Sequence, residues 1–283
     1  MTALRHLMRD PLAAFGLLIV LFVLFALFVA AFAPWLAPFP DDAFESNIMQ
    51  RLRPPSDAFL FGTDNLGRDI FSRVILGTRS ALLVSVSVVL AAMLIGVPIG
   101  LIAGWRDGWL SEGLMRVTDV FLAVPQLILA LALGQLLAPG IFTAMVALAL
   151  TYWPFFARTV FAETRRLRGA LFVDALAGIG AHPARILFLH VLPNAAPAVL
   201  VRATIGMGFT ILTAAILGFL GVGATPPTPD WGLAVAEARQ HLPDAWWFAT
   251  FPGLAIMVLV LGFNLLGDGL RDAADPKLRR SRH

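Results

Sequence analysis

The sequence contains no cysteine, few charged residues and a single lysine, and each scarcity excludes a class of protein. Without cysteine, the chain forms neither disulfides nor thiolate metal sites. Charged residues make up 14% of the 283 residues and apolar residues 59%, which leaves too little polar surface for a water-soluble domain of this size. Lys277 follows a proline in the tail, so the chain has no phosphate-binding loop ending in Lys-Ser or Lys-Thr. ATP hydrolysis by this chain is therefore excluded.

The motifs of hydrolytic enzymes and metal sites are missing as well. The five histidines include no H-E-x-x-H pair, and no serine lies in a G-x-S-x-G turn. We therefore predict that the chain is not an enzyme, binds no metal and carries no cofactor of its own. The formal net charge is only +3 and the basic residues are dispersed in short segments, which argues against nucleic-acid binding.

Long apolar stretches dominate what the sequence does contain. Six of them are long enough to cross about 30 Å of hydrocarbon, which takes roughly 20 helical residues. They are Leu12–Phe32, Ala81–Ile102, Val117–Leu137, Ile141–Phe161, Ala195–Leu217 and Phe248–Leu266. The pattern predicts an all-α membrane protein with six transmembrane helices. Ala31-Phe32-Ala33 resembles a signal-peptide cleavage site, but the apolar run before it exceeds a normal signal peptide, so we interpret this stretch as a retained span.

Positive charge is distributed unevenly among the connecting segments. If successive spans cross the membrane in alternate directions, most of the 21 Lys and Arg residues lie on one side of it, with four in one loop and four in the tail. These eight residues are Arg158, Arg165, Arg166, Arg168, Lys277, Arg279, Arg280 and Arg282. Because positively charged loops stay in the cytoplasm, both termini are predicted to be cytoplasmic.

Glycine and proline mark the interior of three predicted spans. Gly96, Gly100 and Gly104 recur every four residues, a spacing that lets two helices approach closely and that favours packing over chemistry. Pro125 and Pro154 interrupt the third and fourth stretches. A translocation path and ordinary kinks explain such breaks equally well.

One long polar connection precedes the second span. Asp64, Arg68 and Asp69 are spaced for mutual pairing across a turn. We predict that this region is a solvated loop, followed by a short interfacial helix, Ile70–Leu76, rather than a catalytic site.

A second polar segment, residues 172–194, separates the fourth and fifth spans. Phe172, Leu176 and Ile179 fall at i, i+4 and i+7, which predicts a short amphipathic helix. The segment is either an interfacial linker or a docking element for another protein.

A turn and a second helix are expected after the first. Gly180 allows positive φ at the end of the first helix, and Pro183 suits the first turn of a second one. Pro193 is expected to end that second helix before the fifth span. A surface linker would not need a fixed glycine turn between two apolar helix faces, so we favour the docking element.

The order of these residues resembles the EAA motif of the inner-membrane permease subunits of binding-protein-dependent ABC importers. The matching residues are Asp174-Ala175-Leu176, Gly180 and His190-Val191-Leu192-Pro193, with Asp174 in place of glutamate and Leu176 in place of the second alanine. GTDNLGRD from Gly62, LMRVTDVFLAVP from Leu114, FLGVGATPPTPDWG from Phe219 and GDGLRDAADP from Gly267 are similar to the second, C-type permease of the dipeptide, oligopeptide and nickel branch. The matches span almost the whole chain in the right order.

This resemblance implies a type I ABC importer permease fold in the bacterial inner membrane, with a cytoplasmic coupling helix that inserts into a separate ATPase. The residues implied for coupling and docking are Phe172, Asp174, Ala175, Leu176, Gly180, His190 and Pro193. A second related permease, two ABC ATPases that bind ATP and Mg²⁺, and an extracytoplasmic solute-binding protein are implied as partners. The chain divides into an N-terminal segment with the first span and an outer loop (1–78), the permease domain (79–268) and a cytoplasmic tail (269–283).

We predict that the chain forms one half of a pathway for peptides or similar small solutes. Nickel or another small solute is the alternative cargo, and a stand-alone ion-coupled carrier is the alternative mechanism. Arg202, Gln126 and Asn264 lie within predicted spans and are candidates to line the pathway. Arg202 either extends to the headgroups or lines the pathway, where its charge would favour solutes that carry a carboxylate.

Overall fold

The described part of the chain consists of helices joined by turns and irregular loops, with one isolated bridge between Thr63 and Asp69. The computed structural model describes the backbone of residues 11–274, with side chains apart from residues 11–20, 23, 24, 27, 273 and 274. The α-helices are α2 (Pro11–Leu36), α3 (Ile70–Trp105), α4 (Trp109–Ala123), α5 (Gln126–Gly134), α6 (Ile141–Arg168), α7 (Leu171–Gly178), α8 (Pro183–Ile186), α9 (Leu192–Phe219), α10 (Trp231–Ala238) and α11 (Trp246–Ala274). Shorter turns are η1 (Ile48–Gln50), the π-helical η2 (Leu187–Val191) and η3 (Arg239–His241). The predicted all-α class is confirmed.

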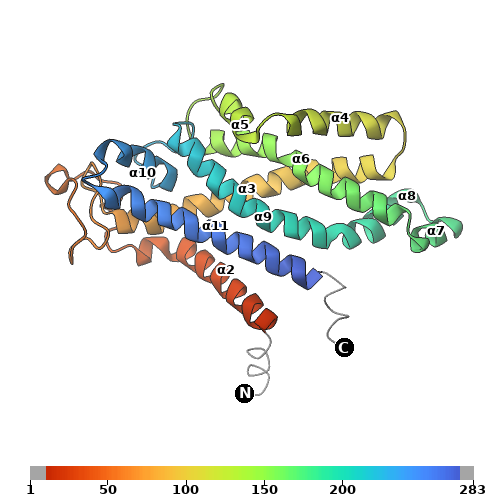
Figure 1. Ribbon diagram of the computed structural model, residues 1–283, viewed down its shortest axis with the longest axis horizontal. Coiled ribbons are helices and arrows are strands. Elements are labelled where there is room, and N and C mark those ends of the chain that lie inside the picture. Colours follow the sequence, from red (N-terminus) through yellow and green to blue (C-terminus); the bar gives the residue numbers. More distant parts are fainter. Residues whose placement is uncertain (1–10, 275–283) are drawn as a thin grey trace, which may run out of the picture.

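Among the described residues, four helical runs are long and apolar enough to cross a membrane. They are α3, α6, the continuous run of α8, η2 and α9, and α11; α4 and α5 together would make a fifth. Figure 1 shows these helices side by side, with α10 near one end of the bundle and α7 and α8 at the other. We refer to these as the α10 end and the α7 end.

The third predicted span is a sharply bent pair of helices. α4 and α5 meet at an angle of 86°. The bend lies at Pro125, which has no N–H for a helical hydrogen bond, and Val124 before it takes an extended conformation with φ −90° and ψ 131°. Pro154, by contrast, lies inside α6 without ending it.

α3 packs against α6 along the three glycines that the sequence places at four-residue spacing. A Cβ on Gly100 would lie 2.5 Å from the carbonyl oxygen of Ala157, and one on Gly104 would lie 2.6 Å from the Cβ of Thr164. A Cβ on Gly96 would also collide with the α6 backbone. The predicted packing role of these glycines is confirmed, because any side chain there would force the two helices apart.

The main hydrophobic core lies between α3, α6 and α9. Tyr152 and Phe156 of α6 are among its largest fully buried side chains, and their rings meet edge to face with centroids 5.9 Å apart. Val191 of η2 and Val199 of α9 complete the core. α6 therefore contributes both to the glycine contact and to the centre of the bundle.

The part of the polar connection next to α3, which contains Asp64, Arg68 and Asp69, is buried, so the solvated loop predicted for these residues is wrong. Arg68 and Asp64 are 1% and 0% exposed, and Arg68 Nε donates to Asp64 Oδ2 at 2.6 Å. Arg68 Nη2 also donates to Glu237 Oε2 of α10 at 3.0 Å. The predicted Asp64–Arg68 pair is confirmed. Through Glu237, Arg68 also ties the connection to α10.

Asp69 takes a different role from the predicted one. Its Oδ2 accepts a hydrogen bond from the Ser72 backbone N–H at 2.8 Å and so caps α3. Burial raises the pKa of the Asp69 carboxyl above its usual value, while the hydrogen bonds from Ser72 lower it in part. The helix that begins here is one element of 36 residues, and the separate Ile70–Leu76 helix does not exist. Arg73, in the first turn of this helix, donates from Nη1 to the Ala43 carbonyl at 2.7 Å.

We expect Arg68→Met to destabilise the protein by about 3 kcal/mol, because it removes the closer of the two arginines that pair with the buried Asp64 carboxylate and leaves only Arg73 Nε, at 3.6 Å. Thermal unfolding of the detergent-solubilised protein measures the loss. Arg166→Met is the matched control, since Arg166 pairs with Glu163 at a side-chain exposure of 66%, where a pair contributes about 0–1 kcal/mol. If Arg68→Met unfolds at the wild-type temperature, the buried pair contributes nothing to stability.

Candidate functional site

The predicted docking segment forms a short helix at one extremity of the bundle. α7 begins three residues after the end of α6 and lies with α8 beyond the other helices (Figure 1). Val173 is buried and Leu176 is half-buried against the main core, which anchors α7 to the ends of α6 and α8. The predicted amphipathic helix is therefore present at this position.

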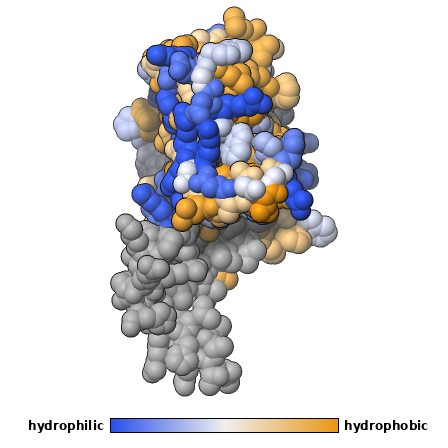
Figure 2. Space-filling model, turned by 90° about the vertical axis from the view of Figure 1, so that its right-hand side faces the viewer, coloured by the Kyte–Doolittle hydropathy of each residue, from blue (hydrophilic) through white to orange (hydrophobic). Residues whose placement is uncertain are grey.

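Most of the α7 surface is not covered by the described part of the chain. Leu171 and Ile179 are 87% and 81% exposed, and Phe172 is exposed as well. Of the predicted apolar face, only Leu176 packs on the chain itself, and Val173 takes the buried position. Asp174 and Ala175 are also exposed. Figure 2 faces this end of the molecule and shows hydrophobic patches among largely hydrophilic side chains.

Gly180 turns the chain sharply after α7. Its φ is +80°, the left-handed conformation that glycine adopts at little cost. The Ala181 N–H donates to the Leu176 carbonyl and the Gly180 N–H to the Ala177 carbonyl, each at 3.0 Å. These two bonds form a Schellman motif, which satisfies carbonyls at the helix end. The expected positive φ at Gly180 is confirmed, as is the position of Pro183 at the start of α8.

Pro193 does not end the second helix, so this prediction is wrong. The helix continues from Pro183 through the π-helical turn into α9, as one run of 37 residues. In that turn the Leu192 N–H donates to the Leu187 carbonyl, a wider spacing that accommodates a proline directly after it. The half-buried His190 lies in the same turn, and its carbonyl accepts a hydrogen bond from Asn194 Nδ2 at 2.6 Å.

Ion pairs tie the loop between α3 and α4 to the end of α6. Asp107 accepts from Arg165 Nη1 at 2.6 Å and contacts Arg168 Nη2 at 2.6 Å. These hydrogen bonds, first from Arg168 and then from Arg165, hold the pKa of the Asp107 carboxyl below its usual value. Arg158 pairs with Asp119 of α4. The positive residues that indicated topology therefore also tie the α3–α4 loop to the end of α6, from which α7 begins.

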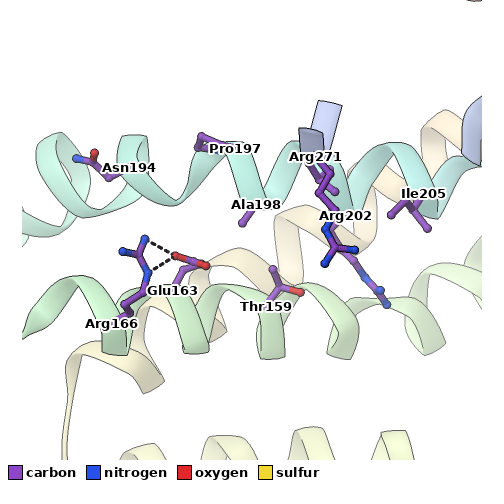
Figure 3. A pocket seen from close by; sticks show the side chains of 10 residues that line it. Thr159, Glu163, Arg166, Asn194, Pro197, Ala198, Arg202, Ile205 and Arg271 are labelled. Carbon is purple, nitrogen blue, oxygen red and sulfur yellow. Dashed lines mark hydrogen bonds and ion pairs between the residues drawn. The ribbon is translucent and has the colours of Figure 1, made fainter. Parts of the chain in front are cut away.

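A cavity of about 760 Å³ opens between α6, α9 and α11, toward the α7 end of the bundle. Figure 3 shows side chains from these three helices around it, with Arg166 and Glu163 joined by two hydrogen bonds. Its lining residues are Thr159, Glu163, Arg166, Asn194, Pro197, Ala198, Val201, Arg202, Ile205 and Arg271.

Arg202 is the one predicted pathway residue that lines this cavity. Its guanidinium carbon lies 4.6 Å from the ring centroid of Phe155 and 5.7 Å from that of Tyr152. Gln126 is elsewhere, at the start of α5, where its Nε2 contacts Thr151 Oγ1 at 3.4 Å. Asn264 lies on α11 against Gly208 of α9. The structure does not bring these three predicted residues into one site.

Two family descriptions match the sequence. Residues 96–280 match the binding-protein-dependent transport system inner membrane component. Residues 1–55 match the N-terminal TM domain of oligopeptide transport permease C. The chain belongs to this permease family.

Relatives of the permease align with nearly all of it. It is 42% identical to the dipeptide transport system permease protein DppC of Alkalihalophilus pseudofirmus, covering 98% of this chain and 90% of the relative. It is 43% identical to the glutathione transport system permease protein GsiD of Pectobacterium atrosepticum, covering 92% and 86%. The predicted resemblance is confirmed.

The fold of the permease matches a solved structure of the MetNI methionine ABC transporter in an inward-facing conformation. The TM-score is 0.60 at 21% identity, and the match covers 73% of the permease and 98% of the transporter chain. The permease therefore has the predicted type I ABC importer fold. It is a transport subunit and not a catalytic enzyme, and its family is the inner-membrane component of binding-protein-dependent transport systems. Within the described residues, no three His, Asp or Glu side chains group as metal ligands.

We expect Gly180→Val to lower ATP-driven uptake strongly at equal permease abundance. A non-glycine residue in the left-handed region costs about 1–2 kcal/mol, and the β-branched valine more, so the turn between α7 and α8 would rearrange. Uptake into membrane vesicles measures the effect. Gly178→Val is the matched control, because Gly178 also has open space around it and does not have positive φ. Wild-type uptake by both variants would show that the turn is not required.

Proposed function

We propose that this permease forms one half of the translocation path of an ATP-driven importer for peptides. The dipeptide and glutathione transport relatives, at 42% and 43% identity, support peptides over nickel as the cargo. The observation that carries the mechanism is α7, a rigid short helix that exposes apolar side chains at the end of a membrane bundle.

α7 acts as the coupling helix in this proposal. Val173 and Leu176 anchor it to the bundle, while Phe172, Asp174 and Ala175 face outward and dock into a separate ATPase. Gly180 holds the angle to α8, and the turn that contains His190 and precedes Pro193 carries movement into α9. ATP and Mg²⁺ bind to the pair of ATPase partners, and this chain contributes no catalytic group.

The membrane arrangement comprises six spans with both termini in the cytoplasm. α2 is the first span, since its 26 residues contain no charged side chain, and the bent α4–α5 pair is the third. Segment 1–78 supplies that first span and an outer loop, 79–268 the permease domain, and 269–283 a cytoplasmic tail. A second related permease completes the path, and a solute-binding protein delivers the peptide at the α10 end.

Cysteine labelling tests this topology without background, because the chain has no cysteine. We expect Asp57→Cys, in the outer connection, to react with a membrane-impermeant maleimide in intact cells. Ala184→Cys, exposed at the start of α8, should react only after the membrane is permeabilised, and so should Thr2→Cys. Labelling of Thr2→Cys and Asp57→Cys from the same side would contradict α2 as a span.

Cross-linking tests the coupling role of α7. We expect Ala175→Cys, on the exposed face of α7, to form a disulfide with a cysteine scanned through the cleft of the partner ATPase. The complex should remain active in import after reduction. Glu112→Cys, exposed at the start of α4, is the control that should not cross-link. If no ATPase position captures Ala175→Cys in an import-competent complex, α7 is a linker and not the coupling helix.

A further inference from the structure

Two arginines that line the cavity between α6, α9 and α11, Arg202 and Arg271, have no carboxylate partner in the described part of the chain, and Arg202 is the less exposed of the two. Within the described residues, no carboxylate oxygen lies within 4.0 Å of the Arg202 guanidinium. Arg166, at the mouth of the same cavity, is neutralised by Glu163 through contacts of 3.0 and 2.7 Å (Figure 3). Arg271 is exposed in the last turn of α11, so the partly buried positive charge of the cavity belongs to Arg202.

Other polar side chains of α6 and α9 that line the cavity already use their donors. The Thr159 hydroxyl donates to the Phe155 carbonyl at 2.8 Å, and the Asn194 amide donates to the His190 carbonyl at 2.6 Å. Arg202 Nε, by contrast, is buried and has no hydrogen-bond partner in the described part of the chain. A buried donor without a partner is costly, so this position favours an acceptor from outside the chain.

The surroundings of Arg202 hold its planar group in place. It lies ten residues after the start of α9, about 15 Å along the helix at 1.5 Å per residue. The rings of Phe155 and Tyr152 support the guanidinium through cation–π contact. Tyr152 is itself buried and packed against Gly206, so this support is rigid. A fixed guanidinium presents parallel N–H groups that match a carboxylate in a bidentate pair.

We propose that Arg202 binds the C-terminal carboxylate of a short peptide in this cavity and selects for solutes with that group. The inference rests on the proposed function and names the part of the peptide that this subunit recognises. Thr159 and the Glu163–Arg166 pair lie around the site, while Phe155 and Tyr152 position the guanidinium.

Binding to the complete importer without its solute-binding protein tests the site directly. The probes are dialanine, with a free carboxylate, and dialanine amide, without one; thermal unfolding of the complex in nanodiscs reports binding. We expect dialanine to raise the unfolding temperature of the wild type and of Arg158→Gln, whose charge is paired with Asp119 outside the cavity. Dialanine amide should have little effect. Arg202→Gln should weaken dialanine binding about ten-fold or more and abolish the difference between the probes, whereas Arg202→Lys, which keeps the charge but loses the planar fork, should be intermediate.

ATP-driven uptake separates this inference from the proposed function. At equal abundance of the assembled complex, Arg202→Gln should lower dialanine uptake about ten-fold, while Phe155→Leu should lower it less. Wild-type dialanine binding by Arg202→Gln, or no discrimination between the probes by the wild type, would overturn the carboxylate site even if peptide import persists. A complex that binds dialanine through Arg202 but imports no peptide would instead refute the proposed function.

Discussion

The close approach of α3 to α6 is the contact on which the rest of the bundle depends. Lipid tails are as apolar as leucine, so helices in a membrane associate mainly through tight packing, and only small residues permit it. Gly100 brings the two backbones within a distance at which even a methyl group would collide. α6, placed in this way, supplies the aromatic support beneath Arg202, the arginines that hold the α3–α4 loop, and the end from which α7 begins.

Charge follows a simple rule in the described part of this chain. Where a charged group is removed from solvent, a partner of opposite sign or a set of hydrogen bonds accompanies it, because an unpaired buried charge is very costly. Arg68 meets Asp64 and Glu237 in the buried cluster near the α10 end. Arg165 and Arg168 meet Asp107 at the α7 end. Arg202 departs from the rule, and it does so inside a cavity large enough for a small solute.

A continuous helix joins the turn after α7, the proposed docking helix, to the cavity that contains Arg202. α8, the π-helical turn and α9 form one run, so no break separates the Gly180 turn from Arg202. A stiff connection suits a subunit that must transmit the closing of a soluble ATPase to a pathway in the membrane. The Schellman motif at Gly180 and the anchoring of Val173 keep α7 at a defined angle to that connection.

The sequence alone determined the helical class, the family, the short helix at α7 and the glycine contact of α3. These features depend on local periodicity and spacing, and Gly96, Gly100 and Gly104 require only that some helix approach them. Tertiary structure decided the burial of Asp64 and Arg68, because their third partner, Glu237, lies 169 residues from Arg68 and no local pattern reveals it. It also decided that Pro125 lies at a sharp bend, whereas Pro193, next to a π-helical turn, and Pro154 lie within continuous helix. Only the folded chain shows that Arg202 has no carboxylate partner, because the residues that surround it come from three separate helices.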